Sequence, residues 1–143
     1  MTESEAARSK DIREQSQRTL DLPLHRFIGV EFIDPSNPSE GVTFVVAEPT
    51  QNDAGMLHGG IMYSLLDFSA LLSLLAEVKQ GEKPVTHDLS VSLLRGVESG
   101  TRVEIRAQVL RRGRAIAFIR AEATADGEIV ATAQITKTIV PPR

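Results

Sequence analysis

The only long helical pattern in the chain is Leu57–Val78, which reads LHGGIMYSLLDFSALLSLLAEV. Apolar residues recur in it at intervals of three or four, the spacing of an amphipathic helix: Leu57, Ile61, Leu65, Phe68, Leu72 and Leu75. Four more apolar side chains widen this stripe around most of the helix: Met62, Leu66, Leu71 and Leu74. A helix that is apolar on most of its girth is buried on most sides, so the pattern predicts a long central helix.

Strand patterns lie on both sides of this helix. Two precede it, at Phe27–Ile33 and Gly41–Glu48, and four follow it, at Val85–Arg95, Thr101–Arg111, Arg114–Thr124 and Glu128–Val140. Short turns between the later strands predict an antiparallel meander. The order of elements predicts an α+β fold in which a long central helix is wrapped by a six-stranded antiparallel sheet.

The length of 143 residues indicates a single domain. Residues 1–20 mix charges of both signs with few apolar positions, which leaves a surface helix and a loose tail open. Residues 21–143 then form the folded domain, with Asp21–Phe27 as a connector or short turn.

Composition excludes several classes of function. Sixteen basic against nineteen acidic residues give a net charge of -3, which argues against a nucleic-acid partner. The absence of cysteine excludes disulfides and thiol catalysis, and the three histidines form no i, i+4 pair for a metal. We expect no metal and no cofactor. Neither a leader segment nor an uninterrupted apolar run of about 18 residues is present, so we expect a cytoplasmic protein with no membrane partner.

The start of the helix is the first candidate site. Asn52 and Gly55 precede the sequence Leu57–Gly60, which carries two glycines after His58. The glycines are ordinary turn residues on one interpretation. On the other, they let a substrate oxygen approach the unpaired N–H groups at the positive end of the helix, as in an oxyanion hole.

Asp67 is the second candidate. A carboxylate in the middle of an apolar helix needs solvent or a partner, or it serves as a general base or nucleophile. Asp67 lies seven residues after Gly60, about 10 Å along the axis, so both groups of one helix cannot act on one carbonyl. If both act, Asp67 comes from a second copy, and two antiparallel helices related by a two-fold axis predict a dimer with sites at its interface.

The pattern Asn52, Gly55, Leu57–Gly60 and Asp67 resembles hot-dog-fold acyl-CoA thioesterases of the PaaI-like, phenylacetate-pathway type. The resemblance covers about residues 24–140. It implies that an acyl- or aryl-CoA is hydrolysed to the free acid and CoA without a cofactor, in a homodimer that assembles further into a tetramer as a dimer of dimers.

The resemblance also implies roles for individual residues. The Gly60 N–H would polarise the thioester carbonyl, and Asp67 of the partner would attack it or activate water. His58 would orient the loop, Asn52 would position the water, and Thr86 would lie near the carboxylate. Substrate-binding candidates complete the set: Leu57, Gly59, Tyr63, Phe68, Arg112 and Arg114. Phe68 stands where relatives often have a small residue, and Arg112 and Arg114 flank a basic turn where CoA phosphates would be held.

Two alternatives remain open. A non-catalytic hot-dog module would bind acyl or CoA groups without turnover. A hydratase of the same fold would need a second catalytic residue along the helix, which the sequence does not supply. No Gly-x-Ser-x-Gly elbow points to a serine hydrolase.

Overall fold

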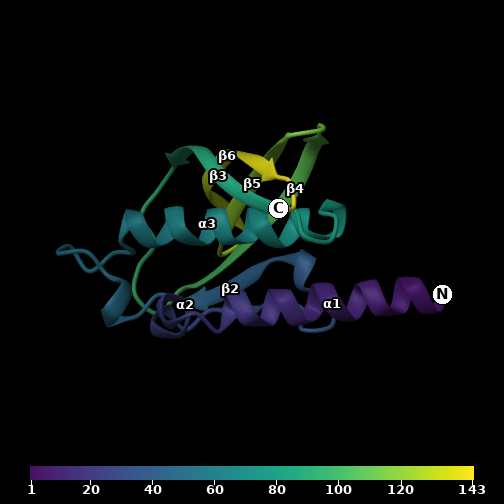
Figure 1. The fold of residues 1–143 in the computed structure, drawn as a ribbon. Coiled ribbons are helices and arrows are strands. Elements are labelled where there is room, and N and C mark those ends of the chain that lie inside the picture. The colour runs from purple at the N-terminus through teal and green to yellow at the C-terminus, as the bar shows by residue number, and fades with distance from the viewer.

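The helix α3 (Gly59–Leu74) lies at the centre of the structure, a computed structural model that describes residues 1–143 (Figure 1). A single antiparallel sheet surrounds it, with the strand order β1-β2-β4-β5-β6-β3. The strands are β1 (Glu31–Phe32), β2 (Val42–Val45), β3 (Lys83–Leu93), β4 (Arg102–Arg112), β5 (Ile116–Ala125) and β6 (Glu128–Val140). Short 3-10 turns lie at Pro38–Glu40, Glu48–Thr50 and Leu75–Glu77. The α+β fold with a long central helix and six strands is confirmed.

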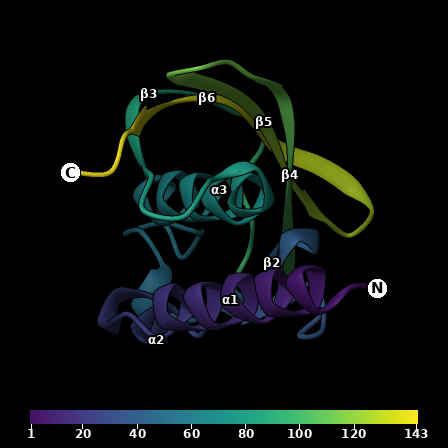
Figure 2. The same ribbon diagram turned by 45° about the vertical axis from the view of Figure 1, so that its right-hand side comes forward.

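The structure has three layers (Figure 2). The sheet curls over one side of α3, and two N-terminal helices, α1 (Glu3–Leu20) and α2 (Pro23–Ile28), lie on the other side. Because both sides of α3 are covered, most of its large apolar side chains are buried, with Leu65 and Leu66 fully inaccessible.

Small side chains let the sheet approach α3 closely. Six alanines on the inner face of β5 and β6 are buried: Ala117, Ala121, Ala123, Ala125, Ala131 and Ala133. Ser69 of the helix, itself buried, donates its hydroxyl to the Ile105 carbonyl of β4 at 3.1 Å. The polar residues that interrupt the apolar helix therefore have partners within the fold, as buried hydroxyls require.

By length and composition alone, α3 and its last turn would suffice to cross a membrane. The segment Gly59–Glu77 has 19 residues and a mean hydropathy of 1.5, although Asp67 and three serines interrupt its apolar run. Half of this segment is buried inside the molecule. Core helices meet the same criterion, and α3 occupies the core position.

The N-terminal residues 3–20 form α1, which packs on the fold. Thr2 caps the helix and exchanges hydrogen bonds with Glu5. Ile12 and Leu20 pack against the core. The Arg8 guanidinium donates to the Leu75 carbonyl at 2.8 Å and to the Val78 carbonyl, at the end of the central helix. A cation there interacts favourably with the negative end of the helix dipole.

Two expectations about the strands are wrong. Phe27–Ile33 is not a strand, and Asp21–Phe27 is not a connector, because Pro23 starts the helix α2 and Gly29 ends it at φ +83°. Proline fits the first turn of a helix, and glycine adopts the left-handed conformation that closes one. Only the two residues of β1 remain as a strand.

The predicted meander is also wrong for β3. This strand pairs with β6, not with β4, so the segment after Leu93 crosses the end of the sheet to reach β4. A register shift between Thr86 and Asp88 makes His87 a bulge. The bulge shifts the inward positions from even to odd numbers, which explains the irregular alternation of this segment. Because β6 is its only neighbour in the sheet, β3 is an edge strand.

We expect Ala121→Leu to destabilise the protein by about 1–3 kcal/mol, because added methylenes beneath α3 overpack the layer between helix and sheet. The neighbouring change Arg120→Leu is the matched control, since Arg120 is exposed on the outer face of the same strand. Urea unfolding of both variants measures the effect. Equal stability of the two variants would contradict the close helix–sheet packing.

Candidate active site at the start of the central helix

The start of α3 presents one free backbone donor. His58 is the N-cap, and its Nδ1 accepts the Gly60 N–H at 2.9 Å. Gly60, the donor predicted from the sequence, is therefore already paired. The N–H of Gly59 donates to no atom of the chain. The available donor at the positive end of the helix dipole is thus the N–H of Gly59, one residue before the predicted Gly60.

The loop before α3 is held in one shape by Asn52. Its Oδ1 accepts the N–H groups of Ala54 at 2.9 Å and Met56 at 3.1 Å. Gly55 lies between them at φ +76°, a conformation that side chains disfavour. The side-chain NH₂ of Asn52 remains as a donor, so this residue both shapes the loop and offers hydrogen bonds.

A cavity of about 330 Å³ lies beside this donor. Most of its wall is apolar, and its lining is Asn52, Met56, Leu57, Gly59, Met62, Leu93, Arg95, Gly96 and Val97. A second cavity of about 440 Å³ adjoins it, shares Met56, Arg95, Gly96 and Val97, and is more polar. Gly59, whose N–H is unpaired, therefore lines a mostly apolar cavity that shares part of its wall with a more polar one.

Asp67 lies elsewhere on α3, in a cluster with Thr86 and Lys137. Its Oδ1 accepts the Thr86 hydroxyl at 2.6 Å and the Lys137 ammonium at 3.1 Å. Lys137 also donates to the Thr86 oxygen at 2.6 Å. The side chain of Asp67 is 37% exposed, whereas that of Lys137 is 4% exposed. The carboxylate is thus anchored on one side and open on the other.

The two halves of the candidate site are apart in one chain. Eight residues separate Gly59 from Asp67, which is about 12 Å along the helix axis. The two groups therefore stay apart within one copy of the chain, which agrees with the separation predicted from the sequence.

Two kinds of comparison bear on these features. The family model described as the thioesterase superfamily matches residues 54–137, which include the glycine pair, Asp67, Thr86 and Lys137. The chain belongs to the thioesterase superfamily. The predicted resemblance to hot-dog thioesterases is confirmed.

Individual relatives agree with this assignment. The chain is similar to acyl-coenzyme A thioesterase 13 of Homo sapiens, with 31% identity over 94 residues. The match covers 64% of this chain and 66% of that protein, slightly less than two thirds. Zebrafish thioesterase superfamily member 2 has a similar structure, with a TM-score of 0.76, 25% identity and coverage of 90% and 95% of the two chains. PaaI from Thermus thermophilus shares the fold, with a TM-score of 0.71, 23% identity and coverage of 82% and 98%.

Within this thioesterase superfamily fold, two predicted substrate-binding side chains lie apart from the cavity. Phe68 is buried and stacks on the His25 ring, with centroids 4.2 Å apart. Successive helix residues point about 100° apart, so Phe68 faces α2 while Asp67 faces β3 and β6. Tyr63 is partly exposed and does not line the cavity. Phe68 therefore does not narrow the pocket within this chain.

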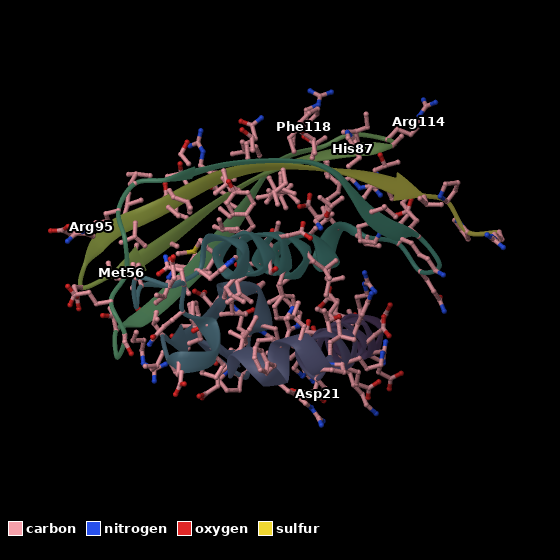
Figure 3. The ribbon with its side chains drawn as sticks, turned by 90° about the vertical axis from the view of Figure 1, so that its left-hand side faces the viewer. Asp21, Met56, His87, Arg95, Arg114 and Phe118 are labelled. Carbon is pink, nitrogen blue, oxygen red and sulfur yellow. The ribbon has the colours of Figure 1, made fainter.

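The basic candidates differ in what they already bind. Arg112 donates to Glu82 at 2.7 Å and to the carbonyls of Glu77 and Arg114. The Lys79 N–H is the main cause of a lowered pKa at Glu82, and the Arg112 guanidinium adds to it. Arg112 is thus engaged within the fold, whereas Arg114 is exposed. Figure 3 shows Arg114 at the opposite end of the sheet from Met56 and Arg95.

Sequence reasoning missed Lys137 and much of the cavity wall. A signal for Lys137 exists: alternate residues of β6 from Ala131 to Ile139 point inward, and Lys137 is the charged member of that face. A lysine at an apolar position of a strand indicates a buried partner. Met56, Met62, Leu93 and Val97 carry no comparable signal, because apolar residues are expected in any core. No cluster of His, Cys, Asp or Glu suited to a metal is present.

We expect His58→Ala to lower stability by about 0.5–2 kcal/mol, because the first turn of α3 loses its capping acceptor. His58→Asn is the matched control, since its side-chain oxygen restores an acceptor at the N-cap. Chemical denaturation of the three proteins measures the difference. If Asn and Ala variants were equally destabilised, the capping role of His58 would be wrong.

Proposed function

We propose that this protein hydrolyses an acyl- or aryl-CoA thioester to the free acid and CoA. The observation that carries the proposal is the pair of groups on α3: an unpaired N–H at Gly59, which lines an apolar cavity, and a partly exposed carboxylate at Asp67. In this proposal the two groups act on one carbonyl and come from two protomers. The name of the human relative, an acyl-coenzyme A thioesterase, supports the substrate class.

The edge strand β3 supports a dimer. Its 11 residues pair with β6 on one side and leave the other side free. A long free edge is a template for pairing with another strand. Val85 and Leu93 on this strand, and Leu94 after it, are exposed apolar side chains that such pairing would cover. Antiparallel pairing of two β3 edges around a two-fold axis would also run the two α3 helices antiparallel.

The proposed chemistry follows from where charge develops. Attack on the thioester carbonyl makes an oxyanion, which the Gly59 N–H would stabilise. Asp67 would take a proton from water as the water oxygen bonds to the carbonyl carbon. Alternatively, Asp67 would itself attack to form an anhydride that water then hydrolyses. In both routes the C–S bond breaks and the CoA thiolate takes up a proton.

Neighbouring donors would assist. With Nδ1 of His58 accepting from Gly60, neutral His58 carries its proton on Nε2 and can donate it to the carbonyl or the leaving thiolate. The free NH₂ of Asn52 would hold the water. Thr86 would act through Asp67, because its hydroxyl already donates there.

CoA recognition is assigned to the polar cavity and to exposed arginines. Arg95 lines both cavities and pairs with Glu128. Arg114 lies at the end of the sheet opposite to the cavities of its own chain, so in an antiparallel dimer it would approach the site of the partner. Arg112 would stabilise the turn at Gly113 and Arg114, whose carbonyls it already binds, and would not bind phosphate. A tetramer built from two dimers and a cytoplasmic location are part of the same proposal, supported by the family resemblance and the composition.

A second candidate function is an acyl- or CoA-binding module without turnover. The pairing of Asp67 with Lys137 favours it, because a carboxylate held in an ion pair also has a structural explanation. Release of thiol from a panel of CoA thioesters distinguishes the two: binding without release would establish the module.

We expect Gly59→Pro to lower kcat by about 10²–10³-fold. Proline deletes the N–H but suits this first helical position, since the preceding His58 has an extended backbone at ψ 128°. Gly59→Ala is the matched control: it adds bulk beside a Leu93 methyl but keeps the N–H. Steady-state kinetics on a thioester that the wild type hydrolyses provide the measurement. Equal activity of the two variants would exclude Gly59 as the donor.

We expect Asp67→Asn to lower kcat by about 10²–10⁴-fold while the dimer persists, because the amide can neither attack nor accept a proton. Light scattering measures the assembly, and a strict monomer of the wild type would contradict the shared site. Turnover equal to that of the wild type would end the proposed mechanism.

Mixing the two inactive variants tests the shared site directly. A dimer of one Asp67→Asn and one Gly59→Pro protomer contains one site with both defects and one site with neither. Random mixing at equal amounts makes half of the dimers mixed, so activity should recover to about a quarter of the wild-type value. If both groups acted within one chain, mixing would restore nothing.

A further inference from the structure

We propose that Lys137 is a positioning residue that fixes Asp67 with one carboxylate oxygen anchored and the other free to react. The inference deepens the proposed function and rests on it. Lys137 is on β6, directly opposite Thr86 on β3 in the strand register, and both face α3. Asp67 therefore meets the sheet at β3 and β6, and β3 is the edge strand that would pair in the proposed dimer.

The burial of Lys137 makes Asp67 its necessary partner. Its side chain is 4% exposed, and Asp67 is the one carboxylate within ion-pair distance. A buried ammonium without an opposite charge is costly, so Lys137 and Asp67 constrain each other. Ala117, buried on β5 opposite Lys137, leaves room for the lysine stem.

Hydrogen-bond chemistry then fixes the direction of the Thr86 hydroxyl. An ammonium has donors only, so at 2.6 Å from Lys137 the Thr86 oxygen must accept. The hydroxyl proton is thereby directed to Asp67 Oδ1, at 2.6 Å. Without Lys137, the Thr86 hydroxyl would be free to rotate to other acceptors, and Asp67 would lose two constraints at once.

Both donors converge on Oδ1 and none of the chain's donors reaches Oδ2. The carboxylate is therefore presented with Oδ1 held against the sheet and Oδ2 on its open side. In the proposed reaction Oδ2 is the atom that attacks the carbonyl or takes the proton from water, and Lys137 touches neither substrate nor water.

A purely structural ion pair is the competing explanation, and energetics separate the two. Replacing the charged member of a buried pair is strongly destabilising when it strands a buried charge. Asp67 is 37% exposed, however, so water can solvate it when the lysine is removed. A purely structural role would therefore lower stability where Asp67 is present and leave kcat unchanged, whereas a positioning role would lower kcat through Asp67.

The test is a double-mutant cycle on wild type, Lys137→Met, Asp67→Asn and the double variant, with kcat, KM and unfolding measured for each. We expect Lys137→Met to lower kcat at least tenfold and to change KM less than threefold. In the Asp67→Asn background the same change should alter kcat less than twofold. Lys137→Arg, which keeps the charge, should recover part of the loss. Lys79→Met is the matched control, since Lys79 is exposed and its side chain makes no hydrogen bond or ion pair.

The outcomes distinguish failure of the positioning role of Lys137 from failure of the proposed thioesterase activity. If the wild type releases thiol and Lys137→Met matches it in kcat, or if the loss is the same with and without Asp67, the positioning role is overturned and the thioesterase stands. A wild type that hydrolyses no thioester of the panel overturns both. Should Lys137→Met fail to fold, Lys137→Gln, which keeps a donor but not the charge, enters the same cycle with the same criteria.

Discussion

The apolar helix α3 is buried between the sheet and the two N-terminal helices, and this burial constrains every other part of the molecule. α3 has no polar face of its own, so it is stable only where both sides are covered. The alanines of β5 and β6 bring the sheet close, and α2 and α1 close the opposite side. Any ionisable group on such a helix must either find a partner in the layers or reach an edge, and Asp67 does both.

The rigidity of that helix also sets the architecture of the proposed site. A rise of about 1.5 Å per residue holds the Gly59 donor and the Asp67 carboxylate too far apart to meet on one carbonyl. A flexible loop could fold back to bring them together, but a buried helix cannot. In the proposed dimer, a second copy in the opposite direction would solve this without moving any element. The free edge of β3 is where such a copy can pair, and it lies beside the cluster that holds Asp67.

Sequence periodicity was sufficient for the helix and for the four later strands, because each has a strong repeat of its own. It failed where a few residues decided the local structure: Pro23 and Gly29 turned a predicted strand into α2. It also failed for pairing, since short turns favour neighbours and β3 instead joins β6. The glycine pair and Asp67 were recognisable by type and spacing. The shift from Gly60 to Gly59 was not, because it depends on which N–H the His58 ring occupies.

The position of Phe68 shows how one helix separates stability from chemistry. Phe68 and Asp67 are adjacent in sequence, yet one stacks on His25 of α2 and the other meets Thr86 and Lys137 on the sheet. The family match begins at residue 54 and so omits α1, α2, β1 and β2. Substitutions in α1 and α2 therefore contact α3 on the side away from the sheet, and they affect the stability of its packing. Changes in β3 and β6 act directly on the carboxylate, so the cluster that holds Asp67 lies in the part of the chain that the family model matches.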